Sequence, residues 1–159
     1  MNIELINENE YEETANMIER SARSSYFSLY YPKCEIDSIT KSLNAEGIKQ
    51  RASWTNFYVV KENKIIVGCG AIGAYWGSET ESSLFSIFVD PDYQRKGIGQ
   101  LIINTLENDE YFRRAKRIEI PASMAAIPFY RKMGYQFKNN ELIYSEGHFA
   151  LEKFNKNNK

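Results

Sequence analysis

Apolar and polar residues follow two different periods along this chain, and the two periods predict two kinds of element. Apolar residues at every second position predict a strand, whereas apolar residues three or four positions apart predict a helix. The predicted strands are residues 3–7, 56–61, 64–72, 83–89, 117–121, 135–138 and 147–154. The predicted helices are residues 8–23, 35–49, 98–108 and 125–133.

Short polar or glycine-containing segments separate these elements. Glu62 and Asn63 lie between two predicted strands and favour a hairpin turn. Gly134 follows the last predicted helix, at the position where glycine commonly ends one. Pro128 is unfavourable deep inside a helix, so this helix is expected to begin at residue 125 or 126.

The order of the elements predicts an α+β fold. Hairpins come early and strand–helix–strand units come late, which favours an α/β/α sandwich-like arrangement around a mixed, mostly antiparallel sheet. The chain has 159 residues, the size of one domain, so we expect a single domain over residues 1–159 with a frayed tail at 154–159.

Composition narrows the functional classes. The chain is 43% apolar and 26% charged, which is ordinary for a soluble globular protein. A net charge of −1 gives no basic excess for nucleic acid or an anionic membrane, and no apolar run reaches the ~20 residues of a membrane span. The N-terminus lacks a signal-peptide core, and Cys34 and Cys69 form no metal motif. We therefore expect a cytoplasmic protein with free thiols, no metal, and neither a membrane nor a nucleic acid as partner.

The segment GCGAIG, residues 68–73, matches the pattern G-x-G-x-x-G of dinucleotide-binding proteins. That function requires a helix that begins inside the motif and holds a pyrophosphate at its N-terminus. Here a loop-like segment and another strand follow, which argues against a nucleotide-dependent oxidoreductase. We interpret the glycines as part of a strand, where they permit a bulge or the close approach of another backbone.

The segment QRKGIG, residues 94–99, has the context that the first glycine motif lacks. A predicted strand precedes it and a predicted helix follows it. Glycines at such a junction let several N–H groups point into one concavity, and the helix dipole adds partial positive charge. Arg95 and Lys96 contribute two further charges. The combination favours a diphosphate-binding turn, although a glycine-rich turn with solvated charges has the same spacing.

With its flanks, this segment resembles the signature of the GNAT superfamily of acyl-CoA-dependent N-acyltransferases. The stretch FVDPDYQRKGIGQLII resembles an apolar strand that ends near V-x-P, followed by [QR]-x-x-G-x-[GA] at the start of a helix. The stretch IEIPASMAAIPFYRKMGY resembles the second family pattern, N-x-x-A-I-x-F-Y-x-K-x-G-[FY], with Ser123 where asparagine is common. Two motifs in the right order are more specific than either one, and together they cover residues 83–137.

The resemblance implies a fold and a cofactor. In the family the fourth and fifth strands run parallel and splay apart, and the pantetheine arm of coenzyme A lies in the split. The expected cofactor is acetyl-CoA, and an N–H of Phe88 or Val89 would polarise the thioester carbonyl. The cofactor-binding residues implied by the resemblance are Ile87, Phe88, Val89, Gln94, Arg95, Lys96, Gly97, Ile98, Gly99, Gln100 and Ser123.

The expected reaction is the attack of a primary amine on an acyl thioester within a ternary complex, which requires a base and an acid. A lysine-like amine has a pKa near 10.4, so neutralising it at pH 7 costs roughly 4.6 kcal/mol unless a base helps. Glu119, between Ile118 and Ile120 on a predicted strand, is the first candidate base, and Glu79 and Glu81 are its rivals. Tyr130 matches the family tyrosine and is the candidate general acid, since a phenol pKa of about 10 is near that of a thiol.

The acceptor is expected to be an amine of a small molecule or a peptide. Its candidate binding residues are Tyr26, Tyr30, Tyr75, Trp76 and Glu81, although core packing would explain the aromatic residues equally well. His148, the one histidine of the chain, either lines a functional face or is simply exposed. A non-catalytic acyl-CoA-binding or regulatory domain is the alternative function, and a homodimer is compatible with the sequence.

Overall fold

The alternating segments of the sequence join in one sheet of eight strands. The computed structural model describes residues 1–24, 28–145 and 147–156. The strands are β1 (Asn2–Leu5), β2 (Thr55–Glu62), β3 (Ile65–Ala74), β4 (Glu81–Val89), β5 (Arg117–Ala122), β6 (Gln136–Phe137), β7 (Tyr144–Ser145) and β8 (His148–Phe154). Their order is β1-β2-β3-β4-β5-β8-β6, with β7 paired to β8, and within the described chain only the β4–β5 pair is parallel. This confirms the predicted mixed, mostly antiparallel sheet and its α+β class.

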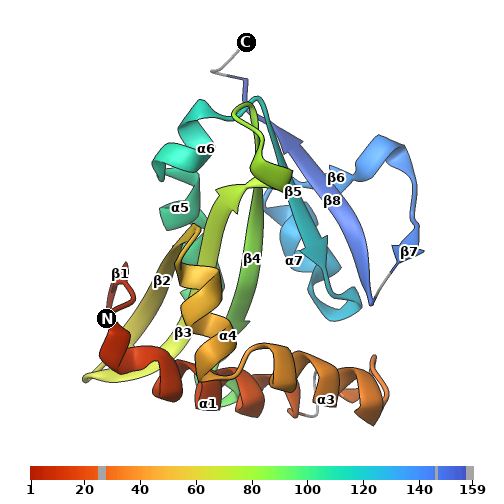
Figure 1. The fold of residues 1–159 in the computed structure, drawn as a ribbon. Coiled ribbons are helices and arrows are strands. Elements are labelled where there is room, and N and C mark those ends of the chain that lie inside the picture. Colours follow the sequence, from red (N-terminus) through yellow and green to blue (C-terminus); the bar gives the residue numbers. More distant parts are fainter. Residues whose placement is uncertain (25–27, 146, 157–159) are drawn as a thin grey trace.

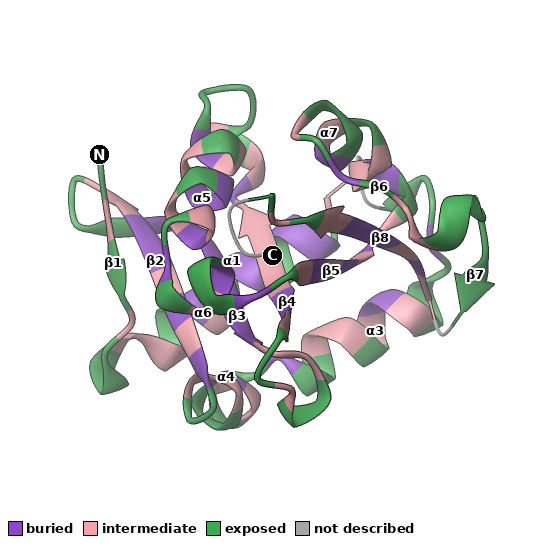
Figure 2. Cartoon of the chain, turned by 90° about the horizontal axis from the view of Figure 1, so that it is seen from above, coloured by how far each residue is buried: buried purple, intermediate pink, exposed green. Residues whose placement is uncertain are grey.

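Helices cover both faces of the sheet. The α-helices are α1 (Tyr11–Ala22), α3 (Lys33–Ser42), α4 (Ala45–Ala52), α5 (Ile98–Glu107), α6 (Glu110–Arg114) and α7 (Ile127–Lys132). The short 3-10 helices are η1 (Glu8–Glu10), η2 (Tyr75–Gly77), η3 (Pro91–Tyr93), η4 (Met124–Ala126) and η5 (Lys138–Asn140). Figure 1 shows the arrangement, and Figure 2 shows α5 and α7 on one side of the sheet with α3 and α4 on the other.

Each face of the sheet has its own core, because successive side chains on a strand point in opposite directions. Ile98, Ile102 and Leu106 of α5 pack with one set of strand residues, whereas Met17 of α1 and Ile48 of α4 pack with the other set. The second core continues through Tyr31 and Ile36 toward α3. Both faces of the sheet are therefore buried, and a group bound between its strands would lie between the two cores.

Two of the predicted element boundaries are wrong because a short local signal was missed, a helix cap in one case and a turn in the other. The helix predicted over residues 35–49 is two helices, since the Asn44 side chain accepts a hydrogen bond from the Gly47 N–H at 2.9 Å and begins α4. The hairpin turn lies one residue later than predicted, at Asn63 and Lys64, which both have positive φ angles of 50° and 68°. Positive φ at both central residues is the conformation that tight hairpins require.

The parallel strands β4 and β5 are paired over only three residues each and then separate. Glu81, Ser82 and Ser83 pair with Arg117, Ile118 and Glu119. The Ser83 hydroxyl donates a hydrogen bond to the Glu119 carbonyl at 3.0 Å, so the two strands are joined where the pairing ends. In Figure 1 the strands diverge from this point toward α3. The splayed strands expected from the family resemblance are thus confirmed.

A β-bulge in β4 lies just beyond this point. Two steps along β3, from Cys69 to Ala71, face three steps along β4, from Phe88 to Phe85. Ser86 takes up the extra residue with a φ of 53°, which is unusual for a residue other than glycine. The Cys69 thiol donates a hydrogen bond to the Ser86 carbonyl at 3.2 Å, which helps to hold the bulge from the sheet side.

The GCGAIG segment lies inside β3, so its interpretation as a strand is confirmed. A Cβ atom on Gly70 would lie 2.5 Å from Cγ2 of Ile102, and one on Gly68 would lie 2.9 Å from Cγ2 of Ile98. Real Cβ atoms do not approach other heavy atoms so closely. The glycines therefore let α5 pack directly against β3. The close neighbours are side chains of a helix, rather than the second backbone that we expected.

Candidate active site

The split between β4 and β5 opens into a cavity of about 620 Å³, a volume typical of small-molecule sites. Its walls come from α3 and α4 on one face of the sheet, from the α7 region on the other, and from the two splayed strands between them. The lining residues are Tyr31, Glu35, Ser38, Ile39, Ser42, Leu43, Arg51, Leu84, Phe85, Ser86, Ile87, Phe88, Ile120, Pro121, Ser123, Ala126, Tyr130, Gly147 and His148. Ile87, Phe88, Ser123 and Tyr130 are thus brought together, as the sequence predicts.

The turn before α5 has the geometry of an anion-binding cradle. Gly97 has a φ of 81° and precedes the first residue of the helix, and a Cβ at this position would meet nothing within 4 Å. No side chain caps the helix, so the N–H groups of Ile98, Gly99 and Gln100 have no acceptor within it. The backbone here is bent and open, and its free donors coincide with the positive end of the helix dipole.

Three hydrogen bonds brace this turn. Asp90 is buried, and its carboxylate accepts hydrogen bonds from Arg20 of α1 at 2.7 Å and from the Asp92 N–H at 2.9 Å. The Gln94 side chain donates to the Val89 carbonyl at 3.2 Å. Gln94 therefore supports the turn in this structure. The side chains of Arg95 and Lys96 are exposed, and the Lys96 ammonium lies 5.0 Å from the centroid of the Tyr93 ring.

Tyr130 combines burial with access to the cavity. Its side chain is 5% exposed and packs beside Phe129, with 5.4 Å between ring centroids. Its hydroxyl has no hydrogen-bond partner among the described residues. Burial raises the pKa of this phenol, so Tyr130 stays protonated at neutral pH. The cavity thus contains a hydrogen-bond donor that the protein itself does not use.

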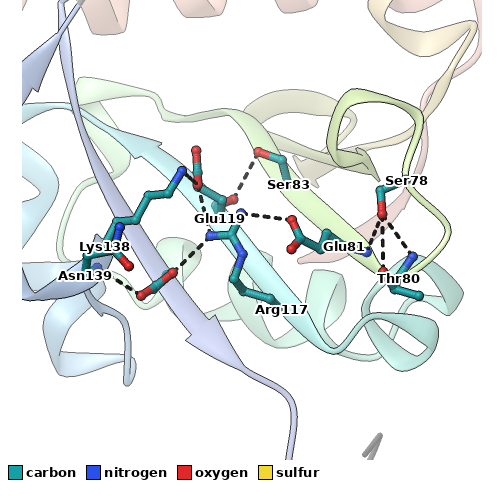
Figure 3. A network of polar contacts seen from close by, with 9 residues as sticks. Ser78, Thr80, Glu81, Ser83, Arg117, Glu119, Lys138 and Asn139 are labelled. Atoms are coloured by element: carbon teal, nitrogen blue, oxygen red, sulfur yellow. Dashed lines mark hydrogen bonds and ion pairs between the residues drawn. The ribbon is translucent and has the colours of Figure 1, made fainter.

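Glu119 lies at the closed end of the split, within a network of ion pairs that Figure 3 shows. Its carboxylate contacts Arg117 at 3.0 Å and Lys138 at 2.9 Å. Arg117 also contacts Glu81 at 3.1 Å and Glu152 at 3.0 Å, so one guanidinium joins three carboxylates from three strands. Glu119 is close to the start of the cavity but is not one of the residues that line it. Its role as base stays a prediction.

The predicted acceptor-binding residues do not gather at the cavity. Tyr26 lies outside the described residues. Tyr30 and Trp76 are exposed and do not line the cavity. The Tyr75 ring lies beneath Arg117, 5.1 Å from its guanidinium carbon, so it belongs to the ion-pair network together with Glu81.

Residues that the sequence reasoning missed form the α3–α4 wall of the cavity. Glu35, Ser38 and Ser42 of α3 line it together with Arg51 of α4. The α3 residues are three and four positions apart, so they lie on one face of the helix. This spacing of polar residues could have been recognised in the sequence as a polar helix face. Arg51 gave no such signal, because only the fold brings α4 beside the bulge in β4.

Within the described part of the chain, two kinds of feature are absent. No group of three or more His, Cys, Asp and Glu side chains is placed to hold a metal ion. No helix has the length and apolar character needed to cross a bilayer.

Comparison with known families and proteins agrees with this geometry. The model of the GNAT acetyltransferase domain matches residues 53–137, more than half of the chain. A ribosomal protein bS18-alanine N-acetyltransferase of Salmonella typhimurium is 34% identical over 74 residues, which cover 43% of this chain and 50% of that protein. An uncharacterised N-acetyltransferase of Methanocaldococcus jannaschii is 32% identical over 89 residues, 52% of this chain and 39% of that protein. The chain spans about half, or less, of these curated relatives.

Solved structures of similar fold cover nearly the whole chain. The PaiA N-acetyltransferase of Thermoplasma acidophilum, determined in complex with coenzyme A, superposes with a TM-score of 0.78 at 16% identity over 98% of this chain and 100% of that one. An aminoglycoside 6′-acetyltransferase of type Ii superposes with a TM-score of 0.71 at 15% identity, over 97% of both chains. At these identities the likeness establishes the fold.

The chain therefore belongs to the GNAT acetyltransferase family, as its two motifs predict. The family is one of acetyltransferases, and the PaiA structure that shares its fold contains coenzyme A.

Proposed function

We propose that this chain is an acetyl-CoA-dependent N-acetyltransferase that modifies a primary amine of a small molecule or a peptide in a ternary complex. One observation carries the proposal: a cavity between two splayed strands contains a protonated, unpaired tyrosine and lies on the same sheet as an open backbone cradle. The alternative function is that of a non-catalytic acyl-CoA-binding domain. Such a domain would not need an unpaired hydrogen-bond donor in the cavity.

The residues present fit coenzyme A. The open space at Gly97 and the free N–H groups of Ile98, Gly99 and Gln100 suit a diphosphate. Arg95 and Lys96 add positive charge beside them. Beyond Ser83 the edge of β4 is not paired with β5, so backbone groups of Ile87, Phe88 and Val89 are available for an extended ligand. When bound, the cofactor supplies an activated acyl group.

The alternation of a strand favours Val89 over Phe88 as the N–H that polarises the acyl carbonyl. The Asp90 N–H donates to the Val67 carbonyl of β3 at 2.8 Å, so it points toward β3. Successive N–H groups on a strand point to opposite edges. The Val89 N–H is thus directed away from β3, toward the split, and it can donate to an oxygen that gains negative charge.

Tyr130 is the proposed general acid. Its phenol stays protonated because burial disfavours the phenolate. A raised pKa also makes complete transfer to a thiolate unfavourable, so Tyr130 acts first as a hydrogen-bond donor to the leaving sulfur and transfers its proton as charge develops there.

Glu119 is the proposed base, and it acts through water because its carboxylate does not line the cavity. Arg117 and Lys138 hold its carboxylate at the end of the split, where it can orient a water molecule. One similar protein is named for an alanine of a ribosomal protein and another for an aminoglycoside. These names support both a peptide and a small-molecule acceptor.

The experiment combines binding with turnover. Acetyl-CoA should raise the unfolding temperature of the purified protein more than ATP or NAD does, and a panel of amines and peptides should release coenzyme A. Tyr130→Phe should lower kcat about 100-fold while the KM for acetyl-CoA changes less than twofold. Tyr111→Phe, which removes a hydroxyl from helix α6 outside the cavity, is the matched control. Stabilisation without release of coenzyme A for any acceptor would favour the non-catalytic alternative, and an unchanged rate in Tyr130→Phe would exclude it as the acid.

A further inference from the structure

Arg51 is the one arginine or lysine among the described residues that line the cavity. It comes from the last turn of α4, on the face of the sheet that also carries α1 and α3. Its guanidinium lies 4.7 Å from the centroid of the Phe85 ring and 5.5 Å from that of Trp54. One of its N–H groups donates to the Ser86 hydroxyl at 3.3 Å.

This guanidinium lacks a countercharge. No carboxylate of a described residue lies within 4.0 Å of Arg51, and its recorded partners are the two rings and one hydroxyl. Burial lowers the pKa of Arg51, which reports the cost of moving the cation out of water. Charged groups in such positions are normally paired, since an unpaired one loses solvation without compensation.

Three other cations around the site contrast with Arg51. Arg117 contacts three carboxylates, Arg20 contacts Asp90, and Lys138 contacts Glu119. Each of these side chains has a structural role that accounts for its charge. Arg51 is left with donors that point to no acidic partner, at the wall of a cavity large enough for a ligand.

The position of Arg51 separates it from the cofactor cradle. The cradle begins α5, which packs on the opposite face of the sheet from α4. Two aromatic rings also contact the Arg51 guanidinium and limit its movement, which favours the binding of a planar anion by its forked donors. A carboxylate accepts two parallel hydrogen bonds from such a fork.

We infer that Arg51 recognises a carboxylate of the acceptor, so that the acceptor class is amines that carry a carboxylate, such as amino acids or peptides with an acidic residue near the reacting amine. The inference rests on the proposed function, which it deepens by naming the acceptor. Arg51 is a specificity-determining residue in this scheme and takes no part in proton transfer.

The test compares acceptors in matched pairs in which one member carries this charge and the other does not. Suitable pairs are alanine with alaninamide, β-alanine with β-alaninamide, and the amidated dipeptide Ala-Asp with Ala-Asn. The carboxylate member of at least one pair should have a kcat/KM roughly tenfold to a hundredfold higher, the ratio typical of a hydrogen bond to a charged group. In Arg51→Met this preference for the carboxylate member should be lost, mainly through KM, and Arg51→Lys should retain part of it. Lys49→Met, an exposed cation on the same helix, is the control and should keep the wild-type ratio.

A second measurement needs no turnover, and so it separates this inference from the proposed function. The N-acetylated forms of the same pairs are titrated against wild type and Arg51→Met by calorimetry, and the carboxylates should bind more tightly only to wild type. Preferential binding without any release of coenzyme A would contradict the proposed function and keep the inference. Equal behaviour of both members in every pair, or a preference that Arg51→Met retains, would overturn the inference. A raised KM for acetyl-CoA in Arg51→Met with unchanged pair ratios would assign Arg51 to the cofactor and overturn it as well.

Discussion

Two glycine motifs in this chain have similar letters and opposite uses. In β3, Gly68 and Gly70 have helix α5 packed where their side chains would be. At the start of α5, Gly97 has open space around it and a φ of 81°. The first motif needs glycine because α5 leaves no room for a side chain. The second needs glycine because its backbone has a positive φ, which glycine adopts without strain. A glycine pattern therefore has no meaning until its surroundings are known.

The two motifs are also physically joined. Ile98 is the first residue of α5 and belongs to the second motif, and its side chain packs over Gly68 of the first. The packing glycines thus fix the height of α5 above the sheet, and with it the position of the free N–H groups at its start. Substitutions in the two motifs should separate these roles.

The largest effect is expected for Gly70→Val. Its side chain would overlap Ile102 and crowd Ile87, so the free energy of unfolding should fall by about 3 kcal/mol, equivalent to about 6–12 °C in a chain of this size. Displacement of α5 should weaken acetyl-CoA binding too. Thermal unfolding with and without acetyl-CoA measures both, and Ile65→Val at an exposed position of β3 is the control. An unchanged unfolding temperature would mean that α5 does not depend on these glycines.

A smaller effect is expected for Gly97→Ala. The positive φ should cost about 1 kcal/mol of stability, whereas the new methyl group, in the space before the N–H groups, should weaken acetyl-CoA binding about tenfold or more. Gly77→Ala is a matched control, because Gly77 has a φ of 74° and the same open surroundings but lies away from the cradle. Calorimetry should find equal losses of stability and a loss of affinity in Gly97→Ala only. Equal affinities would refute the cradle.

The smallest effect concerns Cys69, which lies between the packing glycines and points to the other face of β3. Burial raises the pKa of its thiol to about 12. The unfolded chain releases this proton above about pH 9 and the folded chain does not, so the thiol's contribution to stability is complete below pH 9 and is lost as the pH rises toward 12. Between pH 8 and 10, wild type should lose about 1 kcal/mol more stability than Cys69→Ala. Denaturant titration at several pH values measures this difference, and Cys34→Ala, at an exposed thiol, should match wild type.

Local patterns predicted the family and most of the fold correctly. The two motifs lie in the region that the family model matches, and the splayed strands follow from that resemblance. The signals that failed were caps and turns of one or two residues, as at Asn44 and Lys64. The extent of the domain and the cytoplasmic location remain predictions.

The site was predicted unevenly, for a physical reason. The cradle and Tyr130 lie within or beside contiguous motifs, so sequence spacing carries their geometry. The acceptor wall is assembled from α3, α4 and β4, which are distant in sequence, and no local period brings Arg51 to Ser86. Tyr75 and Trp76 were predicted to bind the acceptor because they are aromatic, but the fold places them at the closed end of the split.

The contact between Arg20 and Asp90 has a consequence for how two bound ligands change each other's affinity. It fastens α1, on the face of the sheet that also carries α3 and α4, to the turn that precedes α5 on the other face. Neither element can shift alone without breaking a charge-assisted hydrogen bond to a buried carboxylate. If the acceptor raises the affinity for the cofactor through this link, the cofactor must raise the affinity for the acceptor by the same factor, since linked equilibria are reciprocal.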